Sequence, residues 1–571
     1  MTTRWRLSLA ALALGALALR VIALDFGLPA VHNPDEIAIL SRALAFAKGD
    51  LNPHNFLYPT FFFYVLSAWI GGAFVLARVT GQVGSLSAFQ QRFFVDPSSI
   101  YLAGRALGAV CGALGTVVTA ILGRTLFDRP TGLAAAALLA VAPVAVLDAH
   151  YVKHDVPATL AIVIALWRLA CCWPEGGATG RVPARDLGVA AVTCGIAWST
   201  HYYSVFLVLP LVATVVDARR REGSYNVALA MVAMGATAAA TFFVLSPFLL
   251  VEPGTAWRDI VANRQIVVDR ATDHGSFANL FRYAALLVGI GATLPVAAAG
   301  AIGTVLLIVT DRRRALLLLS FPVPFLLFIG NTVPASRYLN PVLPIVALTA
   351  AVALRRLSVL LAPRRQGLML AVLTLLAGTP ALIESVRVVT LFSQDDTRTM
   401  AARIIQAQVP AQATILIQPY SVQLTQSRES LEESLRARLG SLDTLGTRAR
   451  LRLAVSPWPQ PSYRLLWLGD GGLDEDKIYV GVGELGPDPL AALRARRVQY
   501  VVLKRYNVAD PVVAPLADAL ARGARRVATI SPYRDDAADT ARAAPFLHNA
   551  DSTLDSRLAR PGPIVDIFQL E

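Results

Sequence analysis

The feature that most constrains this chain is a succession of long apolar segments separated by short polar loops. Many of them approach or exceed the roughly 20 residues that an apolar helix needs to cross a bilayer. The segments lie at residues 7–29, 59–79, 100–126, 131–149, 156–173, 187–200, 203–217, 226–250, 280–308, 315–331, 338–354 and 366–390. Because 55% of the 571 residues are hydrophobic and only 16% are charged, we predict a polytopic α-helical membrane protein.

Basic loops predict the orientation of these segments, because Lys and Arg gather on the cytoplasmic side of a membrane. The N-terminal sequence MTTRWR and the arginines at 219–221, 312–314, 355–356 and 364–365 are therefore expected to be cytoplasmic. With the N-terminus and all of these loops in the cytoplasm, segment 59–79 cannot cross the membrane without reversing the side of every later loop. We predict that it is re-entrant or lies on the surface, within a long external loop at 30–99 that also holds an amphipathic helix at 35–47. The prediction is about 11 spans, plus these juxtamembrane helices in the first external loop.

After residue 390 the apolar segments stop, and short strand-like and helix-like runs alternate. Strands are predicted at 414–418, 498–503, 526–530 and 564–570, and helical or turn-rich stretches at 397–408, 490–497 and 513–521. Residues 391–571 hold 22 Lys and Arg against 21 Asp and Glu, a net charge of +1, so the overall +13 comes from the membrane loops. That distribution is typical of a membrane protein and excludes a nucleic-acid-binding surface. We predict two domains, a transmembrane domain at 1–390 and an external soluble α/β domain at 391–571.

The familiar nucleotide and metal motifs are missing from the sequence. It contains no Walker A motif, no GxSxG elbow, no HExxH and no dinucleotide fingerprint, so nothing supports a nucleotide-dependent reaction. The four cysteines fall in or beside apolar segments, which indicates neither a disulfide framework nor a zinc cluster. No metal-ligand cluster is predicted.

Carboxylates at two segment boundaries are the first candidates for chemistry, since a carboxylate beside hydrocarbon needs compensation. Asp35 and Glu36 follow the first apolar segment, and Asp155 opens the one at 156–173. Asp35 is a candidate general base, with a helix N-cap as the equally weighted structural alternative. Glu36 is more typical of a first-turn residue that favours the helix dipole. Asp155 also has a capping alternative, because Pro157 suits a first helical turn.

Cationic, titratable and aromatic residues near these boundaries are candidates for contacting an anionic substrate. Arg337 opens an apolar segment on the predicted external side, against the usual charge bias, and arginine binds phosphate oxygens in a bidentate manner. Its structural alternative is a side chain that snorkels to the interface. The remaining candidates for substrate binding are Glu36, Lys153, His154, Arg105, His54, Tyr58, His274 and Tyr338. For Tyr58 the alternative is an interfacial aromatic belt, and for a lone histidine it is a structural role.

Taken in order, these motifs resemble the C-type, polyprenyl-phosphate-sugar-dependent glycosyltransferases of the protein O-mannosyltransferase and aminoarabinose transferase kind, glycosyltransferase family 39. The resemblance rests on the stretches NPDE at 33–36, NPHNFLYP at 52–59, YVKHDVP at 151–157, STHY at 199–202, RYLNPVLP at 337–344 and DTR at 396–398. It covers about residues 7–400 well and the tail loosely. The aminoarabinose transferases carry Glu-Lys-Pro-Pro where this chain reads FLYP at 56–59, which argues against transfer to lipid A and against a metal site of that kind.

The resemblance implies an inverting transfer, in which an acceptor attacks the anomeric carbon and polyprenyl phosphate leaves. Asp35 would deprotonate or orient the acceptor, and Asp155 would support the site, together with Lys153. Arg337, Arg105 and His274 would neutralise the charge of the leaving group. The acceptor is left open between protein, lipid and glycan. Members of the family differ in metal dependence, so a divalent ion is also left open.

Two other classes of function compete with a glycosyltransferase. A transporter or flippase of a lipid-linked sugar would also carry charges in the membrane, although it usually places them mid-span on discontinuous helices. A scaffold that presents the soluble domain would leave Asp35, Asp155 and Arg337 without a shared purpose. Only four of the 52 basic residues are Lys, which is typical of a GC-rich bacterial genome. The expected location is a bacterial plasma membrane, with the active site and the C-terminal domain on its external face.

Overall fold

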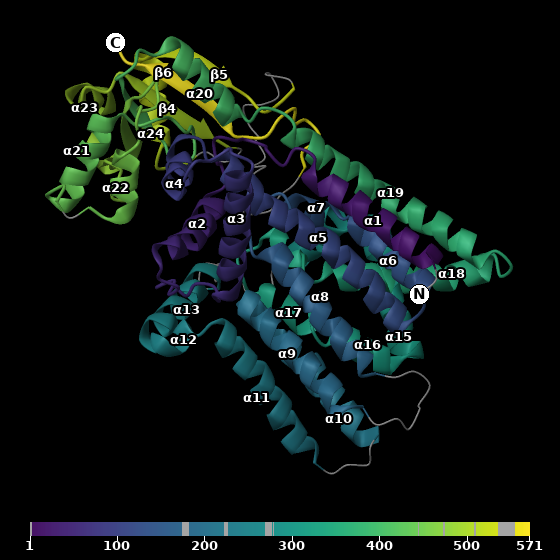
Figure 1. Cartoon of the computed structure of the whole chain (residues 1–571). Coiled ribbons are helices and arrows are strands. Elements are labelled where there is room, and N and C mark those ends of the chain that lie inside the picture. Colours follow the sequence, from purple (N-terminus) through teal and green to yellow (C-terminus); the bar gives the residue numbers. More distant parts are fainter. Residues whose placement is uncertain are drawn as a thin grey trace.

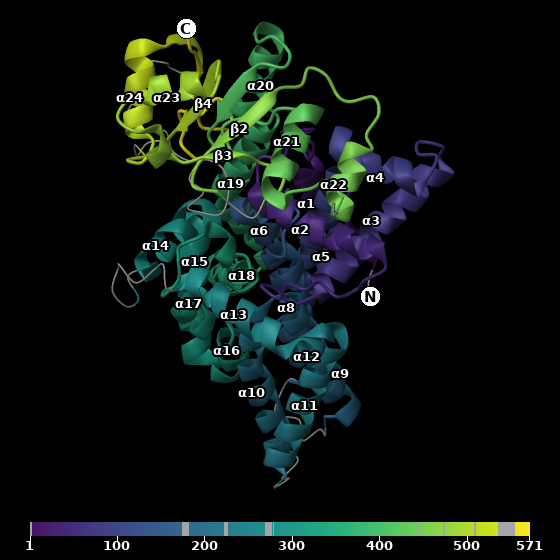
Figure 2. The ribbon, with the colours of Figure 1, turned by 90° about the vertical axis from the view of Figure 1, so that its left-hand side faces the viewer.

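The structure is a computed structural model of the whole chain. It describes residues 3–173, 182–221, 226–268, 277, 279–443, 445–471, 474–506, 510–534 and 554–571. A large helical bundle comes first in the chain, and a mixed α/β part built around one sheet lies beyond one end of that bundle (Figures 1 and 2). The predicted class, a helical membrane protein with a C-terminal α/β part, is confirmed.

The predicted apolar segments are all helical. Up to residue 392 the helices are α1 (Thr3–Val21), α2 (Pro34–Ala45), η1 (Phe46–Lys48), α3 (Phe61–Val79), α4 (Leu86–Val95), α5 (Ser98–Leu126), α6 (Arg129–Ala140), α7 (Pro143–Asp148), α8 (Asp155–Cys171), α9 (Ala184–Thr200), η2 (Tyr202–Leu207), α10 (Val208–Arg221), α11 (Val227–Leu245), α12 (Phe248–Val251), α13 (Pro253–Val267), α14 (Asn279–Leu286), the π-helical turn η4 (Leu287–Gly291), α15 (Leu294–Thr310), α16 (Arg312–Leu319), α17 (Pro322–Ile329), η5 (Ser336–Leu339), α18 (Leu343–Leu361) and α19 (Gln366–Phe392).

Several predicted spans are broken in the structure. Segment 131–149 divides into α6 and α7, segment 280–308 into α14, η4 and α15, and segment 315–331 into α16 and α17. Proline stands at the start of α7, α15 and α17, where its fixed φ suits a first turn and its missing N–H does no harm. Apolar composition alone did not predict these breaks, because a proline among apolar residues is equally compatible with the interior of a single span.

Among the described residues, six helical segments are long and apolar enough to cross a membrane. They are Phe61–Val79, Ser98–Leu126, Tyr202–Arg221, Val227–Leu245, Leu343–Leu361 and Gln366–Gln408. The chain is therefore a multi-pass membrane protein, while the count of about 11 spans stays a prediction. The surface or re-entrant placement of segment 59–79 also stays a prediction. Its helix, α3, is long enough to cross a membrane, and it lies in the chain between α2, which is the predicted amphipathic helix, and α4.

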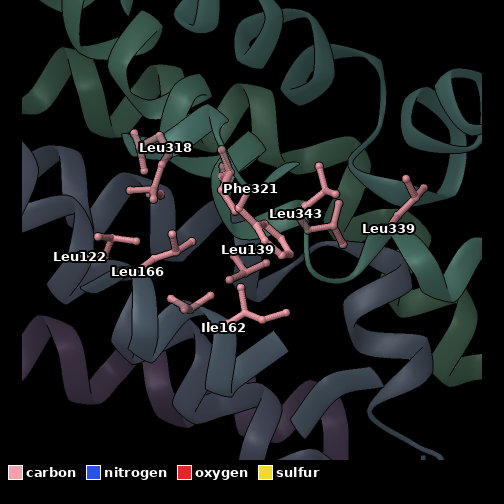
Figure 3. Close-up of a cluster of buried hydrophobic side chains, with 14 of the residues drawn as sticks. Leu122, Leu139, Ile162, Leu166, Leu318, Phe321, Leu339 and Leu343 are labelled. Atoms are coloured by element: carbon pink, nitrogen blue, oxygen red, sulfur yellow. The ribbon is translucent and has the colours of Figure 1, made fainter. Parts of the chain in front are cut away.

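The helices of the bundle pack around one large apolar core. Figure 3 shows part of it, where Leu122 of α5, Leu139 of α6, Ile162 and Leu166 of α8, and Phe321 and Leu343 meet. Close helix contact requires glycine at several points, for example at Gly132, where a methyl group would collide with the backbone carbonyl of Ala120 in α5. This packing positions helix α8, whose first residue is Asp155, and helix α5, which carries Arg105.

The C-terminal part is a six-stranded sheet with helices on it. Its helices are α20 (Thr397–Gln408), α21 (Arg428–Leu439), α22 (Thr447–Leu453), η6 (Val482–Leu485), α23 (Pro489–Ala495) and α24 (Ala514–Gly523). The strands are β1 (Thr414–Ile417), β2 (Arg464–Leu468), β3 (Tyr479–Val480), β4 (Tyr500–Arg505), β5 (Arg525–Ile530) and β6 (Ile564–Gln569), in the order β3-β2-β1-β4-β6-β5. Strands β3, β2, β1 and β4 are parallel, and β6 pairs antiparallel with β4 and β5.

All four predicted strands are present within a few residues of their expected bounds, and the three stretches predicted as helical or turn-rich are helices. Strands β2 and β3 and helices α21 and α22 were not predicted. Strand β3 is only two residues long, and β2 (RLLWL) follows a proline-rich stretch that reads as a loop. The division of the chain at residue 390 stays a prediction, since α19 runs to Phe392 without a break.

Candidate active site

The first turn of α2 holds Asp35 and Glu36 in different surroundings. The helix is capped by Asn33, whose Oδ1 accepts the backbone N–H of Asp35 at 3.0 Å. The capping alternative for Asp35 is therefore wrong, because the sequence offers two capping residues and Pro34 at the first helical position assigns the cap to Asn33. The Asp35 side chain is 32% exposed. Its carboxylate is left to face the site instead of its own helix.

Glu36 forms a buried, bidentate ion pair with Arg105 of α5. The Arg105 Nε and Nη2 donate to the two Glu36 oxygens at 2.9 and 3.0 Å, and its Nη1 donates to the carbonyls of Leu24 and Phe26. Glu36 also accepts the backbone N–H of Val152 at 3.0 Å. Both side chains are at most 1% exposed. Instead of contacting a substrate, as the sequence predicted for Glu36 and Arg105, the pair ties the loop before α2 and the 150–154 loop to α5.

Lys153 brings the two candidate acids into one site. Its Nζ lies 3.4 Å from Asp35 Oδ2, and its side chain is only 3% exposed. Asp155 is the first residue of α8 and is 5% exposed. It interacts electrostatically with Arg337, Lys153 and Asp35. One carboxylate is thus accessible and the other is buried, with two cations beside them.

Arg337 lies in η5, between α17 and α18, with its guanidinium 5.0 Å from the ring centre of Tyr338. Burial acts to lower the pKa of Arg337, but the neighbouring acidic groups, Tyr338, Asp155 and Asp35 foremost, outweigh it and raise that pKa above its ordinary value. Arg337 therefore stays charged, and the structure places it with the acids, as the sequence analysis expected.

Asp148 is a third carboxylate here that the sequence analysis missed. It is 5% exposed at the end of α7, and its Oδ2 accepts a hydrogen bond from Asn340 Nδ2 at 2.5 Å. The same amide donates to the backbone carbonyl of Arg337 at 3.0 Å. Asp148 therefore orients the turn that carries Arg337. The signal that singled out Asp155, an acid at the end of an apolar segment, applies equally to Asp148.

An aromatic cluster borders the acids. The His154 ring stacks on Tyr58 with centres 4.2 Å apart, and the rings of Phe62 and Phe63 lie 4.7 and 5.1 Å from it. Burial lowers the pKa of His154 to about 3. The side chain is thus neutral, and it packs against rings instead of serving as a cation for phosphate.

One further predicted residue, His54, is not part of this cluster. His54 is 59% exposed, with its ring nitrogens 2.9 Å from Asp50 and 2.8 Å from Glu252. The hydrogen bond with Asp50, with a further contribution from Glu252, raises its pKa. The contact with Glu252 ties His54 to the loop before α13. The position of His54 near Tyr58 in the sequence did not predict this contact. His274 lies outside the described residues. In the part of the chain that the structure describes, no group of three or more His, Cys, Asp or Glu is placed to hold a metal ion.

The sheet domain reaches back to the loop that carries Asp35. His32 Nε2 lies 3.1 Å from Thr399 Oγ1 and 3.9 Å from Asp396. Asp396 forms a buried bidentate pair with Arg398 at 2.8 and 2.7 Å. Burial acts to raise the pKa of Asp396, but Arg398, with His32, holds it well below its ordinary 3.8. These contacts fix the loop three residues before the accessible carboxylate.

We expect Asp396→Asn to lower thermal stability at neutral pH, by breaking a buried ion pair. Because the folded-state pKa is depressed, the stabilisation is fully present above the ordinary value and is lost as the pH falls below it. The difference in Tm from wild type should therefore shrink between about pH 7 and about pH 3. Asp395→Asn, in the exposed pair with Arg403, is the control and should change Tm little. A difference for Asp396→Asn that does not depend on pH would contradict the role of this pair.

Comparisons with known proteins agree with the resemblance seen in the sequence. Residues 98–253 match the family model of dolichyl-phosphate-mannose-protein mannosyltransferases. Apo ArnT from Cupriavidus metallidurans is 14% identical over 92% of this chain and 96% of ArnT, with a TM-score of 0.51. ArnT bound to undecaprenyl phosphate is 15% identical over 99% and 98%, with a TM-score of 0.48. The oligosaccharyltransferase of Archaeoglobus fulgidus in complex with Zn and sulfate is 13% identical over 87% and 68%, with a TM-score of 0.47.

No curated protein matches the chain at a significant level. The family model confirms the resemblance to the polyprenyl-phosphate-dependent glycosyltransferases, and the likeness to apo ArnT shows that the chain shares its fold.

Proposed function

We propose that this protein transfers a sugar from a polyprenyl-phosphate carrier to an acceptor, with inversion, at the external face of a bacterial plasma membrane. The observation that carries the proposal is one accessible carboxylate, Asp35, held 3.4 Å from Lys153 at the end of a helical bundle. Asp155 and Arg337 complete the same electrostatic cluster. The match to the mannosyltransferase family model supports the polyprenyl-phosphate donor.

In the proposed reaction an acceptor hydroxyl or amine attacks the anomeric carbon of the donor sugar. The new bond forms from the acceptor atom, and the bond from the anomeric carbon to the phosphate oxygen breaks. Asp35 takes or orients the acceptor proton, since it is the more exposed of the two candidate acids. The electron pair of the broken bond leaves with polyprenyl phosphate, and direct displacement inverts the anomeric centre.

The developing charge on the phosphate needs cations that stay charged when water is excluded. Arg337 meets this need, because its acidic neighbours keep its pKa high. Lys153 pairs with Asp35, so it can orient the base and meet a phosphate oxygen from the same position. Arg105 is not assigned this role, since its donors are spent on Glu36 and two carbonyls. The acceptor class stays open between protein, lipid and glycan.

Arg337→Gln tests this assignment. The variant loses the charge but keeps hydrogen-bonding capacity, so we expect the KM for the polyprenyl-phosphate sugar to rise roughly ten- to hundredfold, the scale of one charge-assisted contact. Arg78→Gln, in the last turn of α3, is the control and should leave that KM unchanged. Equal KM values for wild type and Arg337→Gln, measured with purified protein in nanodiscs, would remove Arg337 from the donor site.

The position of the acids favours a transferase over a transporter of lipid-linked sugars. Asp35 lies in the first turn of α2, and Asp155 is the first residue of α8. Acids of transport paths usually lie mid-span on discontinuous helices.

A further inference from the structure

Two buried polar atoms beside the proposed site have no hydrogen-bond partner. They are Nε2 of His154 and Oη of Tyr203, in side chains of residues that are 2% and 7% exposed. A buried polar atom without a partner costs free energy, so native proteins rarely leave one unless a water or a ligand completes it.

The atoms belong to one aromatic cluster, which also contains His201. Tyr203 stacks on His201 with ring centres 3.7 Å apart, and the His201 ring lies 6.1 Å from that of His154. Tyr58 contacts both histidines, at 4.2 and 5.3 Å between ring centres. The cluster therefore combines apolar aromatic rings with unpartnered hydrogen-bonding atoms.

This cluster adjoins the acids directly. His154 stands in sequence between Lys153, the partner of Asp35, and Asp155. Tyr203 interacts electrostatically with Asp155. A group that satisfies the two unpartnered atoms would consequently lie next to the proposed reaction centre.

The two unpartnered atoms are uncharged hydrogen-bonding groups. Burial lowers the pKa of both His154 and His201, so neither imidazole carries a charge at neutral pH, and a phenol is neutral there as well. A sugar ring matches such a surface: its C–H faces pack on aromatic rings, and its hydroxyls both donate and accept hydrogen bonds. An ammonium or a carboxylate on the ring would find no counter-charge in His154, His201 or Tyr203 and would lose solvation.

We propose that His154 and Tyr203 form the subsite for the donor sugar, each hydrogen-bonding a hydroxyl of a neutral pyranose. The inference rests on the proposed function and narrows its substrate class to carriers that bear a neutral hydroxylated sugar. Because His154, His201 and Tyr203 themselves offer no counter-charge, we expect carriers that bear an amino sugar or a uronic acid to bind more weakly.

The test pairs Tyr203→Phe with its sequence neighbour. The hydroxyl of Tyr202 is already satisfied, since it donates to the carbonyl of Phe56 at 2.9 Å, so Tyr202→Phe is the matched control. Binding to purified protein in nanodiscs would be measured for polyprenyl-phosphate mannose, for its monodeoxy analogues, and for carriers with an amino sugar or a uronic acid. Binding does not require transfer, so a protein that binds these carriers without transferring sugar would contradict the proposed function and leave the subsite standing.

We expect Tyr203→Phe to weaken binding of the mannose carrier roughly ten- to hundredfold. With one monodeoxy analogue the same variant should cause no further loss, because that analogue lacks the hydroxyl that Tyr203 contacts. Tyr202→Phe should preserve the preference among analogues, whatever it does to stability. Wild type also tests the proposal without any variant, because it should bind that analogue and both charged carriers more weakly than the mannose carrier.

Three results would overturn the subsite. The first is that wild type binds all monodeoxy analogues as tightly as the full sugar. The second is that wild type binds a charged sugar as tightly as mannose. The third is that Tyr203→Phe weakens every analogue equally, which is the behaviour of a residue that only supports the fold.

Discussion

Asp35→Asn is expected to lower kcat for sugar transfer by roughly 10²–10⁴-fold, the contribution of a positioned general base. The amide keeps the size of the side chain and can still accept a hydrogen bond from Lys153, but it cannot take the acceptor proton. Stability should change little, because helix α2 is capped by Asn33 and the Asp35 side chain is 32% exposed. The measurement is steady-state transfer from polyprenyl-phosphate mannose in proteoliposomes.

Asp25→Asn serves as the control, since Asp25 is an exposed carboxylate in the loop between α1 and α2. It should retain the activity of wild type. The alternative assignment, with Asp155 as the base, predicts the reverse order of losses for Asp35→Asn and Asp155→Asn. Near-normal kcat in Asp35→Asn, with the protein folded, would remove Asp35 from the chemistry.

Breaking the pair between Glu36 and Arg105 is expected to have the largest effect on stability. Glu36→Gln leaves a fully buried guanidinium without its counter-charge, and loss of one partner of such a pair costs about 3–5 kcal/mol. Activity should fall as well, because Glu36 follows Asp35 in α2 and holds the backbone N–H of Val152, next to Lys153. Thermal unfolding in nanodiscs and transfer activity would be measured on the same sample.

The double variant Glu36→Gln/Arg105→Met separates the charge from the packing. Replacing a buried ion pair by uncharged groups of similar volume is often close to neutral, so the double variant should regain much of the stability that Glu36→Gln loses. The control is Asp96→Asn, an exposed carboxylate between α4 and α5 that accepts the N–H of Ser98. Unchanged thermal stability in Glu36→Gln would show that the pair does not hold the loop.

Much of the helical architecture follows from the sequence, because spacing and apolar length are strong signals. Helix α20 has the predicted bounds 397–408, and the predicted amphipathic helix at 35–47 corresponds to α2. Breaks such as the one between α6 and α7 were not predicted. A proline inside an apolar run is compatible with a kinked span or with two helices, and tertiary packing decides between them.

The candidate site was predictable in part. Sequence position near segment ends singled out Asp35, Lys153, Asp155 and Arg337, which the structure brings together. Charge alone could not tell Glu36 from Asp35, since the difference lies in Arg105, which comes from 69 residues further along the chain.

The residues missed by the sequence analysis lack a distinctive local pattern. Asn340 is an ordinary polar residue in a turn until the fold places it 2.5 Å from Asp148. Tyr203 follows another tyrosine, and only the structure shows that one hydroxyl has a partner and the other has none.

The most direct measurement follows labelled sugar in sealed proteoliposomes supplied with polyprenyl-phosphate mannose and a membrane extract as the source of acceptor. We predict that wild type moves the label to an acceptor while free polyprenyl phosphate accumulates in equal amount, and that Asp35→Asn does neither. Label that crosses the bilayer still attached to its carrier, equally in wild type and Asp35→Asn, would contradict a transferase and indicate a transporter of the lipid-linked sugar.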